Sequence, residues 1–341
     1  MAMDLLGVAG WTVENKTFYE KKLLMRAVPN FVYTGWGIQK PIPTNIGNSI
    51  EWRRLNRPSA ATTALTEGTP PSVTNTTWVS IVATIQQYGA YQQLSDVALR
   101  QSIDNVLSES VDMYGEHMAD SIDRVARAIL VAGTNVQYAN AATSRGALTV
   151  GNILTSTEIR KAVMNLKRRD TRPVARTAAN MQPGSPGGDY GSGGPKYILI
   201  THPDATSDLQ SDSNIVNALQ YAGVRGGDNP LFTGQMFDWL GCRILETSNA
   251  SFVSGAGLSL AAAVHVCQTI VFGEGAYGET EFTQDAMEIK VKPIGSAGAL
   301  DPLDQFGTVG WKAAKAFVIL NQSFLQRIEH ATANNSMPVN P

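Results

Sequence analysis

The chain has 341 residues, of which 43% are hydrophobic and 16% charged, and its formal net charge at pH 7 is −2. A net charge this close to zero excludes a protein that attracts nucleic acid or membrane through the electrostatic field of the whole chain. The charged fraction is low for a freely exposed surface, and we expect partners to cover much of it.

The charges are distributed unevenly along the chain. Residues 1–57 hold eight Lys and Arg against four acidic residues, and residues 158–176 hold seven against two. The remaining residues hold 12 basic and 23 acidic side chains. The sequence therefore predicts two basic segments on an otherwise acidic body.

Residues 1–45 have the character of an arm. A short amphipathic piece at 18–28 is followed by prolines and by the aromatic residues Phe31, Tyr33 and Trp36. A segment that is rich in aromatics but lacks a helical or strand period must lean on another surface to be ordered. A neighbouring subunit is one candidate for that surface.

Two strands with a long loop between them come next. Residues 48–56 and 76–88 are rich in β-forming residues, and the intervening stretch consists of small residues, Gly and Pro. Together they predict a long hairpin. An isolated two-stranded hairpin is marginal in water, so this one needs a surface to lie on.

The strongest structural signal is an amphipathic helix over residues 103–131, preceded by a shorter helix at 96–102. Its apolar residues recur at spacings of three and four, and Gly133 follows its end. A single apolar stripe on so long a helix must pack on a sheet or on other helices. The stripe consists of Ile103, Leu107, Val111, Tyr114, Met118, Ile122, Val125 and Ile129.

A second helix is predicted from Thr155, which forms a capping box with Glu158, to about Arg169. Its end carries the second basic segment, whose charge suits the carboxyl end of the helix dipole. The alternative role for these side chains is contact with nucleic acid, but no aromatics interleave with them to stack on bases. The segment comprises Lys167, Arg168, Arg169, Arg172 and Arg176.

A Gly- and Pro-rich stretch at 183–195 predicts a flexible loop, and a strand follows from Lys196. Helices are expected near 204–210 and 215–222, and residues 235–249 read as a turn into a strand.

Gly273, Gly275 and Gly278 have the G-x-G-x-x-G spacing of a dinucleotide-binding loop, directly after the β-forming run 269–272. Such a loop requires a helix immediately afterwards, whose amide dipoles face the pyrophosphate. The following residues have no helical period, and residues 287–292 alternate like a strand. Three acidic residues would also repel a phosphate: Glu274, Glu279 and Glu281. We therefore interpret the glycines as a turn between strands.

The sequence also shows no motif typical of a redox pair, a metal site or a catalytic site. The cysteines Cys242 and Cys267 form no C-x-x-C pair, so we expect reduced, packed thiols. No histidine has a second ligand at metal-binding spacing, and neither G-x-S-x-G nor H-E-x-x-H is present. We expect no metal, cofactor or catalytic residue. No apolar run approaches 18 residues, and the start does not have the pattern of a signal peptide, so we expect a protein kept in a cytoplasm.

The C-terminal stretch "DPLDQFGTVGWKAAKAFVILNQSFLQRIE", residues 301–329, resembles the signature of a family of major capsid proteins from tailed bacteriophages. Further blocks match that family in order, and the resemblance covers most of residues 45–330, with a departure at 177–195. These blocks are "LSDVALRQSIDNVLSE" (94–109), "AGTNVQYA" (132–139), "ILITHPDATSDL" (198–209), "LGCRILET" (240–247) and "VFGEGAYG" (271–278).

The resemblance implies an α+β chain with the HK-ninety-seven-type capsid fold. Its parts would be an N-terminal arm at 1–45, an extended hairpin loop at 46–92, and a peripheral domain at 93–194 with the spine helix at 103–131. An axial domain would follow at 195–284, and residues 285–341 would return to the peripheral sheet. The glycine turn would then serve the fold, as would Gly307 and Gly310.

The resemblance also implies a structural role without enzymatic activity, in the icosahedral shell around the double-stranded DNA of a tailed phage. The partners would be further copies in hexamers and pentamers, portal and scaffolding proteins, and packaged DNA held by non-specific contacts. A decoration protein is a further candidate. The protein would be assembled in the host cytoplasm and reside in the virion. The alternatives are the shell of a cellular nanocompartment and a dinucleotide-binding enzyme.

Two groups of residues are candidate contact sites. We expect a subunit interface that uses Arg53, Arg54, Arg57, Trp36 and Trp78. Candidate DNA-facing residues are Lys167, Arg168, Arg169 and Arg172.

Overall fold

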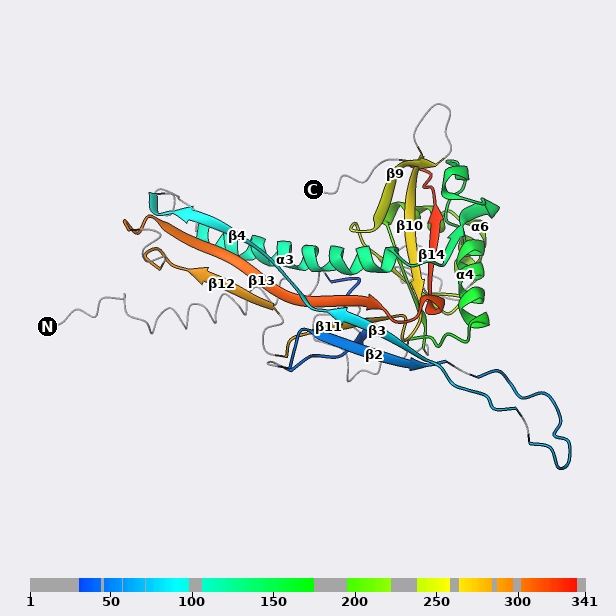
Figure 1. Cartoon of the computed structure of the whole chain (residues 1–341). Coiled ribbons are helices and arrows are strands. Elements are labelled where there is room, and N and C mark those ends of the chain that lie inside the picture. The colour runs from blue at the N-terminus through cyan, green and yellow to red at the C-terminus, as the bar shows by residue number, and fades with distance from the viewer. Residues whose placement is uncertain are drawn as a thin grey trace.

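The computed structural model of the chain describes residues 31–43, 46–56, 58–70, 72–97, 106–174, 195–221, 238–257, 264–283, 287–296 and 302–335. Helices and strands are mixed, as expected for an α+β chain. Figure 1 shows two bodies, one elongated along a single long helix and one compact, with a hairpin that projects from them.

The elongated body is a five-stranded sheet with the long helix α3 (Val106–Val131) along it. The central strand is β13 (Phe306–Ile319), which pairs along one edge with β4 and along the other with β11 and then β12. A short parallel strand, β1, extends the sheet beyond β11. The bounds of the outer strands are β1 (Ile38–Gln39), β4 (Gln86–Ser95), β11 (Tyr277–Glu281) and β12 (Met287–Lys292).

The described part of α3 confirms the helix expected from the apolar spacing. The stripe turns toward the sheet and into the main core, where Val111, Met118 and Ile122 are fully or almost fully buried beside Val309 and Trp311. Burial of such side chains stabilises the fold by about 1.5–3 kcal/mol each. Ile103 and most of the short helix expected at 96–102 lie outside the described residues.

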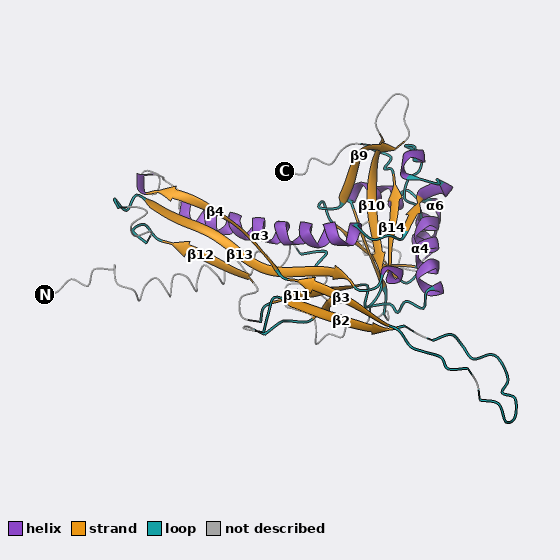
Figure 2. Ribbon diagram, in the orientation of Figure 1, coloured by secondary structure: helices purple, strands orange, loops and turns teal. Residues whose placement is uncertain are grey.

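The compact body is a seven-stranded sheet, in the order β5-β14-β10-β6-β8-β7, with β9 paired to the first half of β10. Figure 2 shows shorter helices gathered around its strands. The strands are β5 (Val136–Tyr138), β6 (Tyr197–Thr201), β7 (Asp238–Trp239), β8 (Cys242–Glu246), β9 (Ser251–Gly257), β10 (Val264–Phe272) and β14 (Leu325–His330).

Three helices cover one face of this sheet, because their apolar residues form one core with those of β6, β10 and β14. They are α4 (Ser156–Arg168), α5 (Pro203–Gln210) and α6 (Ser213–Tyr221). On the other face, Ile198, Ile200 and Ile270 join the core of the long helix. Single 3-10 turns occur at Ala139–Ala141, Arg145–Ala147 and Gln322–Phe324.

The helix α4 begins where it was expected, but the capping box is wrong. Thr155 makes no side-chain capping bond, and the Ser156 N–H instead donates to Asp212 Oδ2 at 2.7 Å. The Glu158 carboxylate accepts hydrogen bonds from Gln137 and Lys161. Asp212 also accepts the Asn214 N–H of α6. Burial alone would raise the pKa of Asp212, but these hydrogen bonds hold it below its ordinary value.

The predicted hairpin exists, with one difference in its second strand. The strand β2 (Ser49–Leu55) pairs with β3 (Trp78–Thr84), and the described residues between them, 56, 58–70 and 72–77, belong to no strand or helix. The expected strand 76–88 divides at Ile85, whose N–H bonds to Asn48 while its side chain is buried. From Gln86 onward the chain is β4 and pairs with β13. The hairpin strands β2 and β3 therefore form a separate two-stranded sheet, and β3 leads directly into β4 of the five-stranded sheet (Figure 1).

Each sheet draws its strands from separate parts of the chain. Residues 136–138 and 325–330 belong to the seven-stranded sheet, and α4 packs on it. The strand β11 belongs to the five-stranded sheet. The chain therefore crosses between the bodies several times.

Candidate assembly surfaces and the junction between the sheets

The glycine turn connects two strands, as its interpretation required. The strand β10 ends at Phe272 and β11 begins at Tyr277, so the turn leads into a strand and not into a helix. Gly275 has φ +73°, a conformation that glycine adopts without strain. A Cβ at Gly273 would lie 2.5 Å from Thr171 Cγ2 and closer still to the carbonyl oxygen of Arg172. The glycines therefore serve the fold.

The turn is one of three chain passages that meet between the two sheets. The Gly273 N–H donates to Phe324 O, and the N–H groups of Leu320 and Asn321 donate to Ala276 O. These bonds join the β10–β11 turn to residues 320–324, which link β13 to β14. The third passage, residues 132–135, leads out of α3. Its Asn135 O accepts the Arg327 N–H at 2.9 Å.

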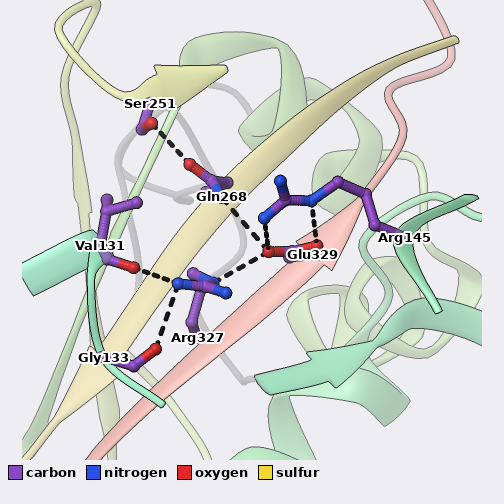
Figure 3. Close-up of polar contacts among 7 residues, drawn as sticks. All are labelled: Val131, Gly133, Arg145, Ser251, Gln268, Arg327 and Glu329. Atoms are coloured by element: carbon purple, nitrogen blue, oxygen red, sulfur yellow. Dashed lines mark hydrogen bonds and ion pairs between the residues drawn. The ribbon is translucent and has the colours of Figure 1, made fainter. Parts of the chain in front are cut away.

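Arg327, a residue of β14, makes polar contacts with several residues of this junction. Its guanidinium donates to the carbonyl oxygens of Val131 and Gly133, which are at the end of α3 (Figure 3). A cation at the carboxyl end of a helix satisfies its free carbonyls and complements its dipole. The same guanidinium lies 2.9 Å from Glu329 Oε1, measured from Nε.

Glu329 is the centre of the polar cluster in Figure 3 and has no solvent-exposed side-chain surface. Arg145 approaches it with two nitrogens, Nε at 2.7 Å and Nη2 at 2.5 Å, and Gln268 donates to Oε1 at 3.2 Å. Although burial alone would raise the pKa of Glu329, the hydrogen bonds from Arg145 and Gln268 and the nearby guanidinium charges hold it below its ordinary value. The carboxylate therefore stays ionised in the protein interior.

Sequence reasoning missed this cluster. The residues Arg327 and Glu329 stand inside the R-I-E end of the C-terminal stretch, but Arg145 is 184 residues away in sequence. No local pattern marked Glu329 as buried, because only Leu325 and Ile328 are apolar in the strand Leu325–His330.

Gly310 and Gly307 allow close packing, as the resemblance implied. A Cβ at Gly310 would lie 2.7 Å from Tyr91 Cβ and 2.8 Å from Ala90 O, both on the paired strand β4. At Gly307 it would lie 3.2 Å from Lys292 O. Next to Gly310, the indole N–H of Trp311 donates to His117 Nδ1 at 3.0 Å and links β13 to α3.

The hairpin presents two different faces because its side chains alternate. Trp52 and Ile50 turn toward the body, where they pack near Ala314 and Ala316. Arg53 and Arg54 are both exposed but point to opposite faces, and Arg53 pairs with Glu51 of its own strand at 3.1 Å. Arg57 lies outside the described residues.

The outer face of the hairpin carries exposed apolar side chains. The strand register places Trp78 opposite Leu55, with Val82 on the same face. Their exposed fractions are 67%, 44% and 59%. Large apolar side chains grouped on one exposed face are typical of a protein contact site.

The aromatic side chains of the arm pack against residues of the same chain. Tyr33 is fully buried in the main core, and Phe31 and Trp36 pack against that core while half-buried. The Trp36 indole N–H donates to Val32 O at 2.9 Å. A neighbouring subunit is therefore not needed to order residues 31–36, and the Trp36 side chain remains partly accessible.

The side chains of the basic segment at the end of α4 differ in their exposure to solvent. Lys167, Arg168 and Arg172 are exposed, whereas Arg169 is half-buried and donates to Gln326 Oε1 at 3.1 Å. Arg176 lies outside the described residues.

Both cysteines belong to strands of the seven-stranded sheet. The thiols of Cys242 and Cys267 are free and buried, and burial raises the pKa of Cys267 to about 12. Within the described residues, no three His, Cys, Asp or Glu side chains are grouped to hold a metal ion. None of the described helices has the length and hydropathy needed to span a membrane.

The fold is shared with solved phage capsids. The capsid of Ralstonia phage GP4 matches with a TM-score of 0.62 at 12% identity, covering 92% of this chain and 91% of that one. The acidic stable capsid of Helicobacter pylori bacteriophage KHP30 matches with a TM-score of 0.61 at 13% identity, covering 86% and 88%. Cyanophage Pam1 matches with a TM-score of 0.59 at 15% identity, covering 90% and 92%. At these identities the likeness shows the fold, which is the expected HK-ninety-seven type.

A search of curated proteins finds no match to the chain. The model of the family "Phage capsid protein", in contrast, matches residues 78–320, which include β4, α3, the glycine turn and the whole of β13. The alternative of a dinucleotide-binding loop is excluded, because the glycines are followed by the strand β11 and not by a helix. The chain therefore belongs to the phage capsid protein family and is a structural shell subunit, not an enzyme.

Proposed function

We propose that the chain is the major capsid protein that builds the icosahedral head of a tailed phage by self-assembly into hexamers and pentamers. The observation that carries this proposal is that the fold covers about nine tenths of solved capsid subunits from end to end. The elongated sheet and the projecting hairpin suit a subunit that reaches over its neighbours. Electron microscopy of the purified chain tests the proposal.

The hairpin is the surface best suited to contact a neighbouring subunit. It combines the apolar outer face of Leu55, Trp78 and Val82 with the exposed Arg53 and Arg54. An apolar centre with charges beside it is typical of protein interfaces. The half-buried Trp36 would contribute from the arm.

We expect the triple variant Arg53→Glu, Arg54→Glu, Arg57→Glu to fold but not to assemble. Each exposed ion pair contributes at most about 1 kcal/mol, but the same contacts repeat in every subunit of a shell. Circular dichroism would report the fold, and sedimentation with electron microscopy would report assembly.

The matched control replaces the same three arginines with lysine, which keeps the charge, and this variant should still form shells. Normal shells from the glutamate variant would contradict a role of these arginines in assembly.

The exposed cations of the second basic segment would contact packaged DNA only weakly. DNA must enter and leave a head, so strong phosphate binding would hinder its function. We expect sequence-independent binding no tighter than about 10⁻⁶ M at physiological salt, with each phosphate contact adding about 0.9 to the salt slope. Fluorescence anisotropy on two unrelated DNA sequences, across a salt series, measures both.

The triple variant Lys167→Glu, Arg168→Glu, Arg172→Glu should flatten that salt slope, while an Arg169→Gln variant, changed at the half-buried position, should alter it less. Binding that discriminates between sequences and persists in high salt would contradict this role.

Portal and scaffolding proteins and assembly in the host cytoplasm belong to the same proposal, and a decoration protein would be a further partner. The second candidate, the shell of a cellular nanocompartment, shares the fold but would enclose an enzyme. Shells purified from the native source that hold protein cargo and no DNA would favour it.

A further inference from the structure

Two buried carboxylates bind the backbone of residues 31–37. Asp123 of α3 accepts the N–H groups of Val32 and Tyr33 through Oδ1, at 3.0 and 2.7 Å. Glu279 of β11 accepts those of Gly35 and Gly37 through Oε1, at 2.6 and 3.2 Å. Four backbone N–H groups within six residues therefore donate hydrogen bonds to two side chains. We call this arrangement the amide latch.

The packing around the latch fits this segment closely. The Tyr33 side chain is fully buried, and its carbonyl accepts the Tyr277 hydroxyl at 2.6 Å. A Cβ at Gly37 would lie 2.7 Å from Tyr277 Cε2, so a side chain there would displace the ring. Immediately afterwards, β1 pairs with β11. The latch therefore fixes the point at which the arm joins the body.

The surroundings of Asp123 do not neutralise its charge. The groups that act on Asp123 are Asp120 of its own helix, the Asn249 side chain and the Tyr33 hydroxyl of the arm, and the Cys267 thiol of β10 and Arg127 act on that hydroxyl in turn. Arg127 directs its Nη1 to Asn249, at 2.6 Å from the carbonyl and 2.8 Å from Oδ1. Burial raises the pKa of Asp123 to about 6, against the lowering effect of the two backbone hydrogen bonds.

Among the described residues, the cation that acts on Glu279 is Lys315, and this cation is shared. The Lys315 ammonium of β13 pairs with Glu281 at 3.1 Å and lies 5.9 Å from the centre of the Phe31 ring. The other titratable group that faces Glu279 is Tyr277. Burial raises the pKa of Glu279, although Lys315 and the two amides act in the opposite direction.

We propose that the amide latch is a pH-responsive attachment, which holds residues 31–37 most firmly in acid and loosens as the pH rises. The docked state keeps a proton on a buried carboxyl that the undocked state, exposed to water, releases. Docking of residues 31–37 therefore takes up a proton. Its free energy becomes less favourable as the pH rises from the ordinary pKa of the undocked carboxyl to the raised pKa of the docked one. The direction is opposite to that of a carboxylate held by a cation.

Hydrogen exchange of the full-length chain tests the latch. Protection of the amides of residues 32–37, corrected for intrinsic exchange, would be measured at pH 5 and pH 8 in the same assembly state. We expect the opening equilibrium to rise about tenfold over this range from Asp123 alone, as proton linkage between its ordinary and raised pKa requires. The amides of β13 serve as the internal reference for global opening.

The variant Asp123→Asn keeps an oxygen acceptor for both amides but cannot ionise, so its opening should show a smaller pH response than the wild type. Glu279→Gln tests the second carboxylate independently, in case the first variant is unstable throughout. The proposal is overturned by a wild-type opening equilibrium that does not rise with pH. It is equally overturned if both variants respond to pH as the wild type does.

Discussion

The Glu329→Ala variant should lose about 3–5 kcal/mol of its free energy of unfolding, the cost of leaving buried charges without their partner. The removed carboxylate faces Arg145 and Arg327, and the Arg327 side chain is itself only 13% exposed. The loss would also free the guanidinium that holds the end of α3. Urea denaturation of the unassembled chain, followed by circular dichroism, measures the change.

The matched control is Glu51→Ala, which removes a carboxylate from the exposed pair with Arg53. Its free energy of unfolding should change by less than about 1 kcal/mol, because water screens such a pair. Similar losses in the two variants would show that the cluster in Figure 3 contributes no more than a surface ion pair, contrary to this account.

The Gly273→Ala variant should lose about 1–3 kcal/mol or more, because the new methyl group has no room. It would meet the carbonyl oxygen of Arg172 and the Cγ2 atom of Thr171, and the former belongs to the backbone. The matched control is Gly151→Ala, where nothing lies within 4 Å of the added Cβ, and it should change stability by less than about 0.5 kcal/mol. Equal stability of both variants, measured by thermal unfolding, would refute the role of Gly273 in the junction.

The sequence predicted the elements whose signal is local. The helix α3 could be recognised because its apolar spacing is a property of the helix itself. The glycine turn could be distinguished from a dinucleotide loop because the following residues have no helical period. The hairpin could be placed because two β-rich runs flank a Gly- and Pro-containing loop.

What the sequence missed depends on residues that are distant along the chain. The N-terminus of α4 uses Asp212, which lies 56 residues beyond Ser156, and not the nearby Thr155. The run 76–88 reads as one strand, but its two halves pair with different partners. The amides of the arm find Asp123 about 90 residues away and Glu279 about 244 residues away. No local pattern specifies such pairs.

The candidate contact surface was only partly predictable for the same reason. Arginines at 53 and 54 look like one cluster in the sequence, but strand alternation directs them to opposite faces. Trp78 could be placed on the outer face only once its register against Leu55 was known.

Electron microscopy of the purified full-length chain, under conditions that favour assembly, tests the central claim most directly. This account predicts closed icosahedral shells or rings of six and five subunits, with the hairpin of one subunit over its neighbour. A chain that remains monomeric at high concentration, with its hairpin exposed to solvent, would contradict the account.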